Sequence, residues 1–254
     1  MSSNHLDGAG PPRPRGGRGL PLAFKRNPVS LGLLAFTAAV FAGQMASVAL
    51  TGEDWLLYYG VKFRLFILAG QWWRLVTPIF LHLDLTHFMI NMFSLYALTP
   101  QIERFFGPRR TLSFYLISGV GGVGLSLAFS DNPSAGASGA IFGVVGALGT
   151  FIYLHQKYLG QLGRQQLMRI AAITLMNLAL GLSPGIDNWA HMGGLASGIA
   201  LTFWFGPRLE KVDMGEERIA LVDQRPWPSI QGRVAMSAVV VVGLAVVAAY
   251  GFQL

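Results

Sequence analysis

The sequence predicts an all-α polytopic membrane protein, on the strength of its composition and of its recurring apolar segments. Of 254 residues, 52% are hydrophobic and only 12% are charged, whereas a soluble globular chain carries roughly 25% charged residues. The mean hydropathy is +0.48. Apolar segments of helical length recur along the chain, and about 20 such residues span the hydrocarbon core of a bilayer. The composition therefore excludes a disordered chain and argues against an ordinary soluble domain.

The first segment, residues 1–27, differs from the rest because it lacks an apolar run. It holds five basic residues and four prolines among several glycines. We interpret it as a disordered, basic, cytosolic tail. A mitochondrial transit peptide is the alternative, since arginine is frequent and acid is scarce. The proline and glycine content argues against the amphipathic helix that such a peptide needs.

Seven membrane spans are expected after this tail. Proline follows three of them: Pro100 follows the second, Pro184 the fifth and Pro207 the sixth. In chain order the predicted spans are Val29–Leu50, His82–Leu98, Leu112–Phe129, Ser138–Leu154, Leu167–Leu182, Trp189–Phe205 and Val234–Phe252.

The basic residues of the connecting segments predict the orientation. With a cytosolic N-terminus, 16 Lys and Arg residues lie inside and only Lys62, Arg64 and Arg74 lie outside. This split follows the positive-inside rule. The net charge of +7 is then explained by topology, and we expect no nucleic-acid partner. The long outer segment Thr51–Phe80 is rich in Trp, Tyr and Phe, which is typical of a segment lying in the membrane interface.

Polar side chains within the spans form a first cluster at the start of the second span. His87 and Asn91 are four residues apart, so they share one face of a helix, and His82 lies a further turn away. Polar groups at membrane depth are costly and often functional. Hydrogen bonding between helices is the simpler interpretation of this cluster.

A second cluster surrounds Ser138, which stands between Gly136 and a helix rich in small residues. The free N–H groups of a helix N-terminus can bind a developing oxyanion, so this serine is well placed as a nucleophile. The pattern is not the GxSxG elbow of the α/β-hydrolases, because Ala140 occupies a position that needs glycine. Close helix packing through small residues is the alternative.

A third cluster opens the sixth span, where His191 precedes the GxxxG step of Gly194 and Gly198. This step predicts close packing against the helix of Ser138. The predicted topology places all three clusters at one depth below the outer face. We therefore expect a Ser138–His191 dyad, with the ring of Phe142 supporting the imidazole and with His87 and Asn91 stabilising the oxyanion. Candidates for a third, orienting acid are Asp84, Asp131 and Asp187.

From Trp73 to Gly198 the sequence resembles the rhomboid intramembrane serine proteases. The resemblance rests on Trp73–Arg74, on His82, His87 and Asn91, on Glu103, on Gly136–Gly139, and on Ala190–His191 with Gly194 and Gly198. It implies a six-helix rhomboid core plus one additional C-terminal transmembrane helix. It also implies Ser138 as nucleophile, His191 as base, and His87 with Asn91 as oxyanion donors. Phe142 stands where the family often has tyrosine.

The resemblance further implies membrane-spanning segments of other proteins as substrates, cut near the outer membrane face. We expect four segments: the tail 1–27, the protease domain 28–206, a charged cytosolic linker 207–233 and a seventh helix 234–254. The expected location is a bacterial plasma membrane, with an organelle inner membrane as the alternative. We expect no cofactor and no metal, since the chain has no Cys and no HExxH motif. Alternative functions are a non-catalytic rhomboid-like escort factor, a transporter and a metalloprotease.

Overall fold

The computed structural model of the chain describes residues 27–183, 185–213 and 219–251. The predicted tail 1–27 lies outside these residues except for Asn27. The long helices of the described part are α2 (Pro28–Thr51), α5 (Leu85–Phe106), α6 (Pro108–Phe129), α7 (Ser138–Leu154), α8 (Gln156–Leu180), α9 (Asn188–Phe205) and α10 (Trp227–Gly251). Shorter elements are the helices α3 (Trp55–Gly60) and α4 (Arg64–Leu68), the 3-10 turns η1 (Trp72–Leu75) and η2 (Thr77–Phe80), and the strands β1 (Leu209–Asp213) and β2 (Ile219–Asp223).

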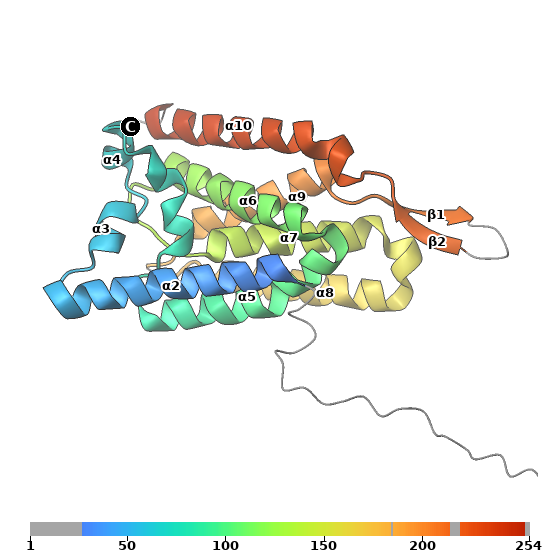
Figure 1. Ribbon diagram of the computed structural model, residues 1–254, viewed down its shortest axis with the longest axis horizontal. Coiled ribbons are helices and arrows are strands. Elements are labelled where there is room, and N and C mark those ends of the chain that lie inside the picture. The colour runs from blue at the N-terminus through green and yellow to red at the C-terminus, as the bar shows by residue number, and fades with distance from the viewer. Residues whose placement is uncertain (1–26, 184, 214–218, 252–254) are drawn as a thin grey trace, which may run out of the picture.

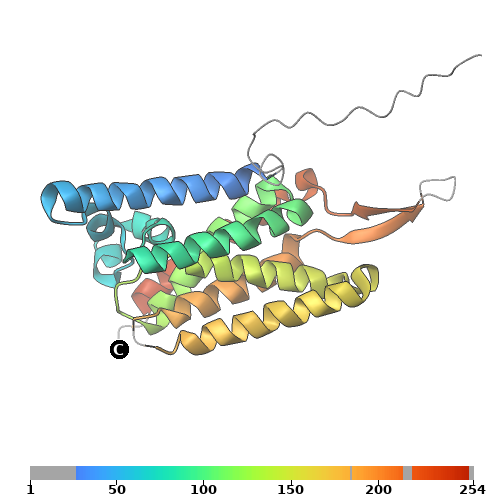
Figure 2. The same cartoon turned by 90° about the horizontal axis from the view of Figure 1, so that it is seen from below.

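The long helices lie side by side along one axis, as Figures 1 and 2 show. Helix α7 is the central helix, since nearly all of its residues from Gly139 to Ile152 are buried. Helices α6 and α9 pack against α7 and against each other, and α10 packs on α6. In Figure 2, α2 and α8 lie on opposite flanks of this core. The expected all-α membrane fold is confirmed.

By length and apolar composition, three described helices qualify as membrane spans: α2, α6 and α10. Helix α7 is shorter but equally free of charge. The remaining long helices carry the polar side chains that the sequence analysis singled out, such as Asn91 on α5 and His191 on α9. These polar groups face the interior of the bundle, where the lipid does not reach them.

The second predicted span was wrong at both ends. It was expected to cover His82–Leu98, but α5 begins at Leu85 and runs through Pro100 to Phe106. Proline removes one hydrogen bond from a helix interior. Side chains on either side bind neighbouring carbonyls instead: Thr99 Oγ1 donates to Leu95 O at 2.6 Å, and Gln101 Nε2 donates to Ala97 O at 2.7 Å. The carbonyl to which Pro100 has no N–H to donate is that of Tyr96, between these two acceptors.

Glu103 lies in the part of α5 beyond the predicted end of this helix, and it has a structural role at the start of α2. Its carboxylate accepts hydrogen bonds from Val29 N–H at 2.9 Å, from Ser30 N–H at 2.7 Å and from Ser30 Oγ at 2.6 Å. The first N–H groups of a helix have no partner within it, and a carboxylate suits the positive end of its dipole. Glu103 therefore joins α5 to the N-terminus of α2.

The starts of two other helices also differ from the prediction. Helix α8 begins at Gln156 rather than Leu167, and α10 begins at Trp227 rather than Val234. In both cases polar residues extend the element beyond its apolar part, which a hydropathy pattern does not detect, and in α8 the extension is kinked at Gly160, whose φ of 58° is not helical. The predicted linker 207–233 contains the antiparallel hairpin β1–β2, in which Leu209 pairs with Asp223.

The segments predicted to be cytosolic meet at one end of the bundle. Arg110 Nη1 donates to Asp223 Oδ2 at 2.6 Å, and Leu209 N–H donates to His155 Nε2 at 2.9 Å. These bonds join the hairpin to the start of α6 and to the α7–α8 turn. The short helices α3 and α4 lie at the opposite end, beside the C-terminus of α10 (Figure 1). The two sets of connecting segments therefore lie at opposite ends of the bundle.

Candidate active site

Two of the predicted site residues meet directly at the end of the bundle that holds α3 and α4. Ser138 is the first residue of α7, and His191 lies in the first turn of α9. His191 Nε2 and Ser138 Oγ are 2.9 Å apart, within hydrogen-bonding distance. The imidazole is buried, with 9% of His191 exposed, and Ser138 is partly exposed. A serine hydroxyl bonded to a buried imidazole is the arrangement from which a nucleophile is generated.

Small residues allow the two helices to approach closely enough for this bond. A Cβ atom on Gly194 would collide with the carbonyl oxygen of Gly139, and one on Gly198 would collide with that of Gly143. The predicted GxxxG contact between α9 and α7 is therefore present. Any larger side chain at Gly194 or Gly198 would push His191 away from Ser138.

Phe142 lies one helical turn after Ser138 and stacks on the imidazole as expected. The ring centroids of Phe142 and His191 are 4.5 Å apart, and the rings are inclined by 13°. This stacking holds the plane of the imidazole and leaves its edge, with Nε2, directed at Ser138. The hydroxyl that a tyrosine would carry is not needed for this contact.

Gly136 and His87 lie close to Ser138. Gly136 has a φ of 148°, which disfavours side chains. A Cβ atom there would lie 2.8 Å from His87 Nε2 and 3.6 Å from Ser138 Oγ. The imidazole of His87 and the hydroxyl of Ser138 thus face the same small space. Gly136 keeps that space open, and its N–H donates to Pro78 O at 2.9 Å.

His82 is placed behind His87 rather than against Ser138. Its ring centroid is 5.2 Å from that of His87, and its backbone exchanges hydrogen bonds with the Gln44 side chain at 2.9 and 3.0 Å. Neither ring nitrogen of the buried His82 has a hydrogen-bond partner among the described residues. The ring of His82 thus lies against that of His87.

Asn91 is buried on α5, one turn after His87. One Nδ2–H group donates to the backbone carbonyl of His87 at 2.9 Å, which leaves a second N–H group available. In the described part of the chain, neither His87 nor Asn91 bonds to Ser138 Oγ. Such donors need to reach the oxyanion of the transition state rather than the resting hydroxyl.

None of the three candidate acids reaches the second ring nitrogen of His191. Nδ1 of His191 is buried without a hydrogen-bond partner in the described residues. Asp84 caps α5 by accepting from His87 N–H at 2.8 Å, and Asp131 pairs with Arg64. Asp187 caps α9 by accepting from Ala190 N–H at 3.0 Å. The geometry is that of a dyad without an orienting acid.

The sequence analysis missed Lys62, which it treated only as one of three outer cations. Lys62 is 0% exposed, and its Nζ donates to Ser126 Oγ at 2.8 Å and lies 3.9 Å from Asp187 Oδ2. Burial lowers the pKa of Lys62 from 10.5 to about 8, although Asp187 partly opposes this. A lone lysine in an apolar aromatic segment was the signal that could have drawn attention to it.

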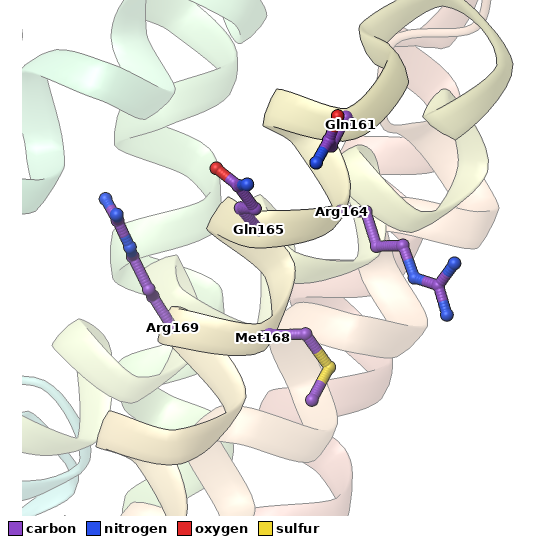
Figure 3. A pocket seen from close by; sticks show the side chains of 5 residues that line it. All are labelled: Gln161, Arg164, Gln165, Met168 and Arg169. Carbon is purple, nitrogen blue, oxygen red and sulfur yellow. The ribbon is translucent and has the colours of Figure 1, made fainter.

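One hollow on the described surface lies away from these residues. It has a volume of about 520 Å³ and is lined by Gln161, Arg164, Gln165, Met168 and Arg169 of α8. Figure 3 shows these side chains along one helix, pointing in several directions rather than toward a common point. The hollow lies near the start of α8, whereas Ser138 is at the far end of the antiparallel helix α7. It is not part of the candidate active site.

Comparison with known proteins adds the family. The family model of the rhomboid domain matches residues 69–208, more than half of the chain. The chain belongs to the rhomboid family. The matched region includes every residue of the candidate active site, from His82 to Gly198, and leaves α10 outside.

Curated relatives carry rhomboid names. The rhomboid chain is 40% identical over 150 residues to Rhomboid protease GluP of Bacillus subtilis, covering 58% of this chain and 29% of that protein. It is 37% identical to RHOMBOID-like protein 4 of Arabidopsis thaliana, covering 57% of this chain and 36% of that protein. It is 40% identical to RHOMBOID-like protein 6, mitochondrial, of Arabidopsis thaliana, covering 53% of this chain and 44% of that protein. The matches span less than half of each relative's length.

Proposed function

We propose that this rhomboid chain is an intramembrane serine endopeptidase that cleaves membrane-spanning segments of other proteins near the outer membrane face. The observation that carries the proposal is the 2.9 Å contact between Ser138 Oγ and His191 Nε2. The name of the Bacillus subtilis relative, a rhomboid protease, supports the same activity.

In the proposed reaction, Ser138 Oγ attacks the scissile carbonyl while His191 Nε2 accepts the hydroxyl proton. The carbonyl oxygen becomes an oxyanion, for which the N–H of Ser138 and the side chains of His87 and Asn91 are the proposed donors. The imidazolium then gives its proton to the leaving amine, and an acyl-enzyme forms. Water, activated by the same imidazole, hydrolyses this ester and regenerates Ser138.

Phe142 has a supporting role in this scheme. Its ring covers one face of the imidazole, as the 4.5 Å stacking distance indicates. The stacked ring limits rotation of His191, a task that an orienting acid performs in a triad. Its quadrupole also favours the cationic imidazolium that forms during attack.

The proposal includes an orientation and a division of the chain. The chain is placed in a bacterial plasma membrane with its N-terminus in the cytosol. This orientation follows from the distribution of basic residues between the two ends of the bundle. Residues 28–206 form the proposed protease domain, 207–233 a cytosolic linker with its hairpin, and 234–254 an added membrane helix. No nucleic acid, metal or cofactor has a part in the proposed reaction.

The experiment is activity-based labelling of the purified chain in detergent with a fluorophosphonate, which reacts with activated serines. We expect modification of Ser138 alone and its loss in Ser138→Ala. Ser118→Ala is the matched control, since Ser118 is a buried helical serine bonded to Phe114 O, and its labelling should equal wild type. A non-catalytic rhomboid-like escort factor would show no labelling and would still bind membrane helices.

A further inference from the structure

Lys62, in the segment between α3 and α4, holds the loop that leads into Ser138. Its N–H donates to Ser134 O at 3.0 Å, and its carbonyl accepts from Ser134 N–H at 3.1 Å. The two segments thus form an isolated antiparallel bridge. Ser134 stands four residues before Ser138, and the short loop between them contains Gly136 with its unusual φ. The backbone of Lys62 therefore sets where this loop begins.

The side chain of the same residue holds the start of α9. Nζ of Lys62 donates to Ser126 Oγ at 2.8 Å and to Ser130 O at 3.0 Å, at the end of α6. Ser126 Oγ in turn donates to Asp187 Oδ2, which lies 3.9 Å from the ammonium. One carboxylate oxygen of Asp187, Oδ2, thus belongs to this network, and the other, Oδ1, caps α9.

Asp187 connects this network to His191. Its Oδ1 accepts from Ala190 N–H at 3.0 Å, and its backbone carbonyl accepts from His191 N–H at 3.3 Å. A shift of Asp187 would therefore carry the first turn of α9, and the imidazole with it. Displacements of about 1 Å at reacting groups cost on the order of 10²-fold in rate.

We infer that Lys62 is a positioning residue for the Ser138–His191 dyad, acting through Ser134 on the serine side and through Ser126 and Asp187 on the histidine side. The inference rests on the proposed protease function and deepens it. Lys62 touches neither dyad residue, so its effect is on their relative placement. It also makes the outer segment 51–80 part of the active site's support.

A second buried cation of the same segment provides a matched control. Arg64 is also nearly buried, and it donates to Asp131, to Leu127 O and to the carbonyls of Ala248 and Ala249. Asp131 stands three residues before Ser134, but no hydrogen bond of Arg64 to Ser134, Ser126 or Asp187 is present among the described residues. Arg64→Met therefore removes a buried charge of the same segment without breaking either route to the dyad.

The test measures the rate constant of fluorophosphonate labelling at Ser138 per folded molecule, in detergent, for Lys62→Met, Asp187→Asn, their combination and Arg64→Met. Asparagine still caps a helix, so Asp187→Asn keeps the acceptor for Ala190 N–H and removes the charge facing Lys62. We expect each of the first two variants to label about ten-fold more slowly or worse, and Arg64→Met to stay within about two-fold of wild type. The double variant should be no slower than the slower single variant, because both act along one route.

A second readout separates positioning from general damage. With a membrane-spanning peptide substrate, Lys62→Met and Asp187→Asn should lower kcat and leave KM near wild type, because the substrate does not contact them. Wild-type labelling in Lys62→Met, or multiplied losses in the double variant, would overturn the inference. If Lys62→Met does not fold, Asp187→Asn decides the matter through the same two readouts. Absence of labelling in wild type would instead overturn the proposed function.

Discussion

His191 directs one ring nitrogen at Ser138 and leaves the other, Nδ1, buried without a partner among the described residues. A dyad of this kind relies on packing to orient the imidazole. The ring of Phe142 packs on one face of the imidazole. The close contact of Gly194 with α7 fixes the helix that carries His191. The chemistry of this site therefore depends on few hydrogen bonds and on several shape-complementary contacts.

The dyad should behave as one unit when it is mutated. Ser138→Ala and His191→Ala should each abolish cleavage of a membrane-spanning substrate, and the double variant should be no worse than either. His87→Ala and Asn91→Ala should lose about 10²–10³-fold in rate, since the N–H of Ser138 remains as a donor. Steady-state cleavage in detergent measures all five variants. Full protease activity in Ser138→Ala would contradict the mechanism.

Gly136→Ala should impair the site although it adds a single methyl group. The methyl group would lie 2.7 Å from His87 Cε1, and the φ of 148° disfavours any side chain. Such backbone strain costs about 1–3 kcal/mol. We expect labelling of Ser138 to fall by about 10²-fold. Gly32→Ala on α2 is the control, because no heavy atom lies within 4 Å of its added Cβ, and it should label normally.

Lys62 should give the fold a pH dependence of known sign. Burial lowers its folded pKa to about 8, against 10.5 when exposed. Between these two values the unfolded chain binds a proton that the folded chain has released, so the free energy of unfolding rises with pH. Thermal denaturation of wild type and Lys62→Met in detergent should show wild type gaining stability relative to the variant across this range. A constant difference between them would contradict the pKa shift.

At the scale of the elements, α8 is the long helix that is least attached to the core. Only Gly163 among its residues is buried, and its main neighbour is α7. The membrane-spanning substrate proposed above would need a lateral entrance to reach Ser138, and a loosely packed helix provides one. Pro184, in the loop that follows α8, lies outside the described residues.

Two leucines of α8 differ in how they contact the bundle. Leu175 is 68% exposed and faces away from the bundle, whereas Leu178 is partly buried and its carbonyl accepts from Asn188 Nδ2 at 3.1 Å. Leu178→Ala should therefore loosen α8 and speed cleavage of membrane-spanning substrates several-fold. Leu175→Ala is the matched control and should cleave at the wild-type rate. Slower cleavage by a folded Leu178→Ala variant would indicate another entrance.

Periodicity and small-residue spacing were enough to predict the helices and the meeting of α7 and α9. Ser138, His191 and Gly194 each lie within three residues of a helix start or of a GxxxG step. Local pattern and topology were therefore sufficient to predict that these residues come close together. Lys62 was missed because its partners, Ser126 and Asp187, are distant in sequence and share no pattern with it. Helix α5 was cut short because proline usually ends a helix, and the bonds of Thr99 and Gln101 cannot be read from hydropathy.

At the scale of the whole molecule, α10 stands outside the matched rhomboid domain but is not a separate unit. It packs along α6, and its last carbonyls accept from Arg64 at 3.1 Å. One side of α10 is free, since only 22% of its most apolar window is buried. The added helix is therefore peripheral, but the bonds of Arg64 join it to the outer segment.

A chain ending at Pro226 should still cleave its substrate in detergent. The dyad, His87 and the Gly194 contact all lie within α5, α7 and α9, which this truncation leaves intact. It should unfold at a lower temperature, because Arg64 loses two carbonyl partners and α6 loses its cover. Cleavage assays and thermal denaturation of the purified truncation measure both effects. Complete inactivity of a well-folded truncation would show that α10 belongs to the catalytic core.

The bonds of Arg64 also have a consequence for biogenesis. Arg64 is made early, yet two of its acceptors, the carbonyls of Ala248 and Ala249, are the last part of the described chain to leave the ribosome. Until α10 is inserted, a guanidinium near the membrane surface lacks two of its three carbonyl partners. Since chains begin to fold during synthesis, the first outer segment is completed only by the final helix. The Ser138–His191 contact, which α7 and α9 supply, does not wait for that step, so the dyad would form before the outer segment reaches its final packing.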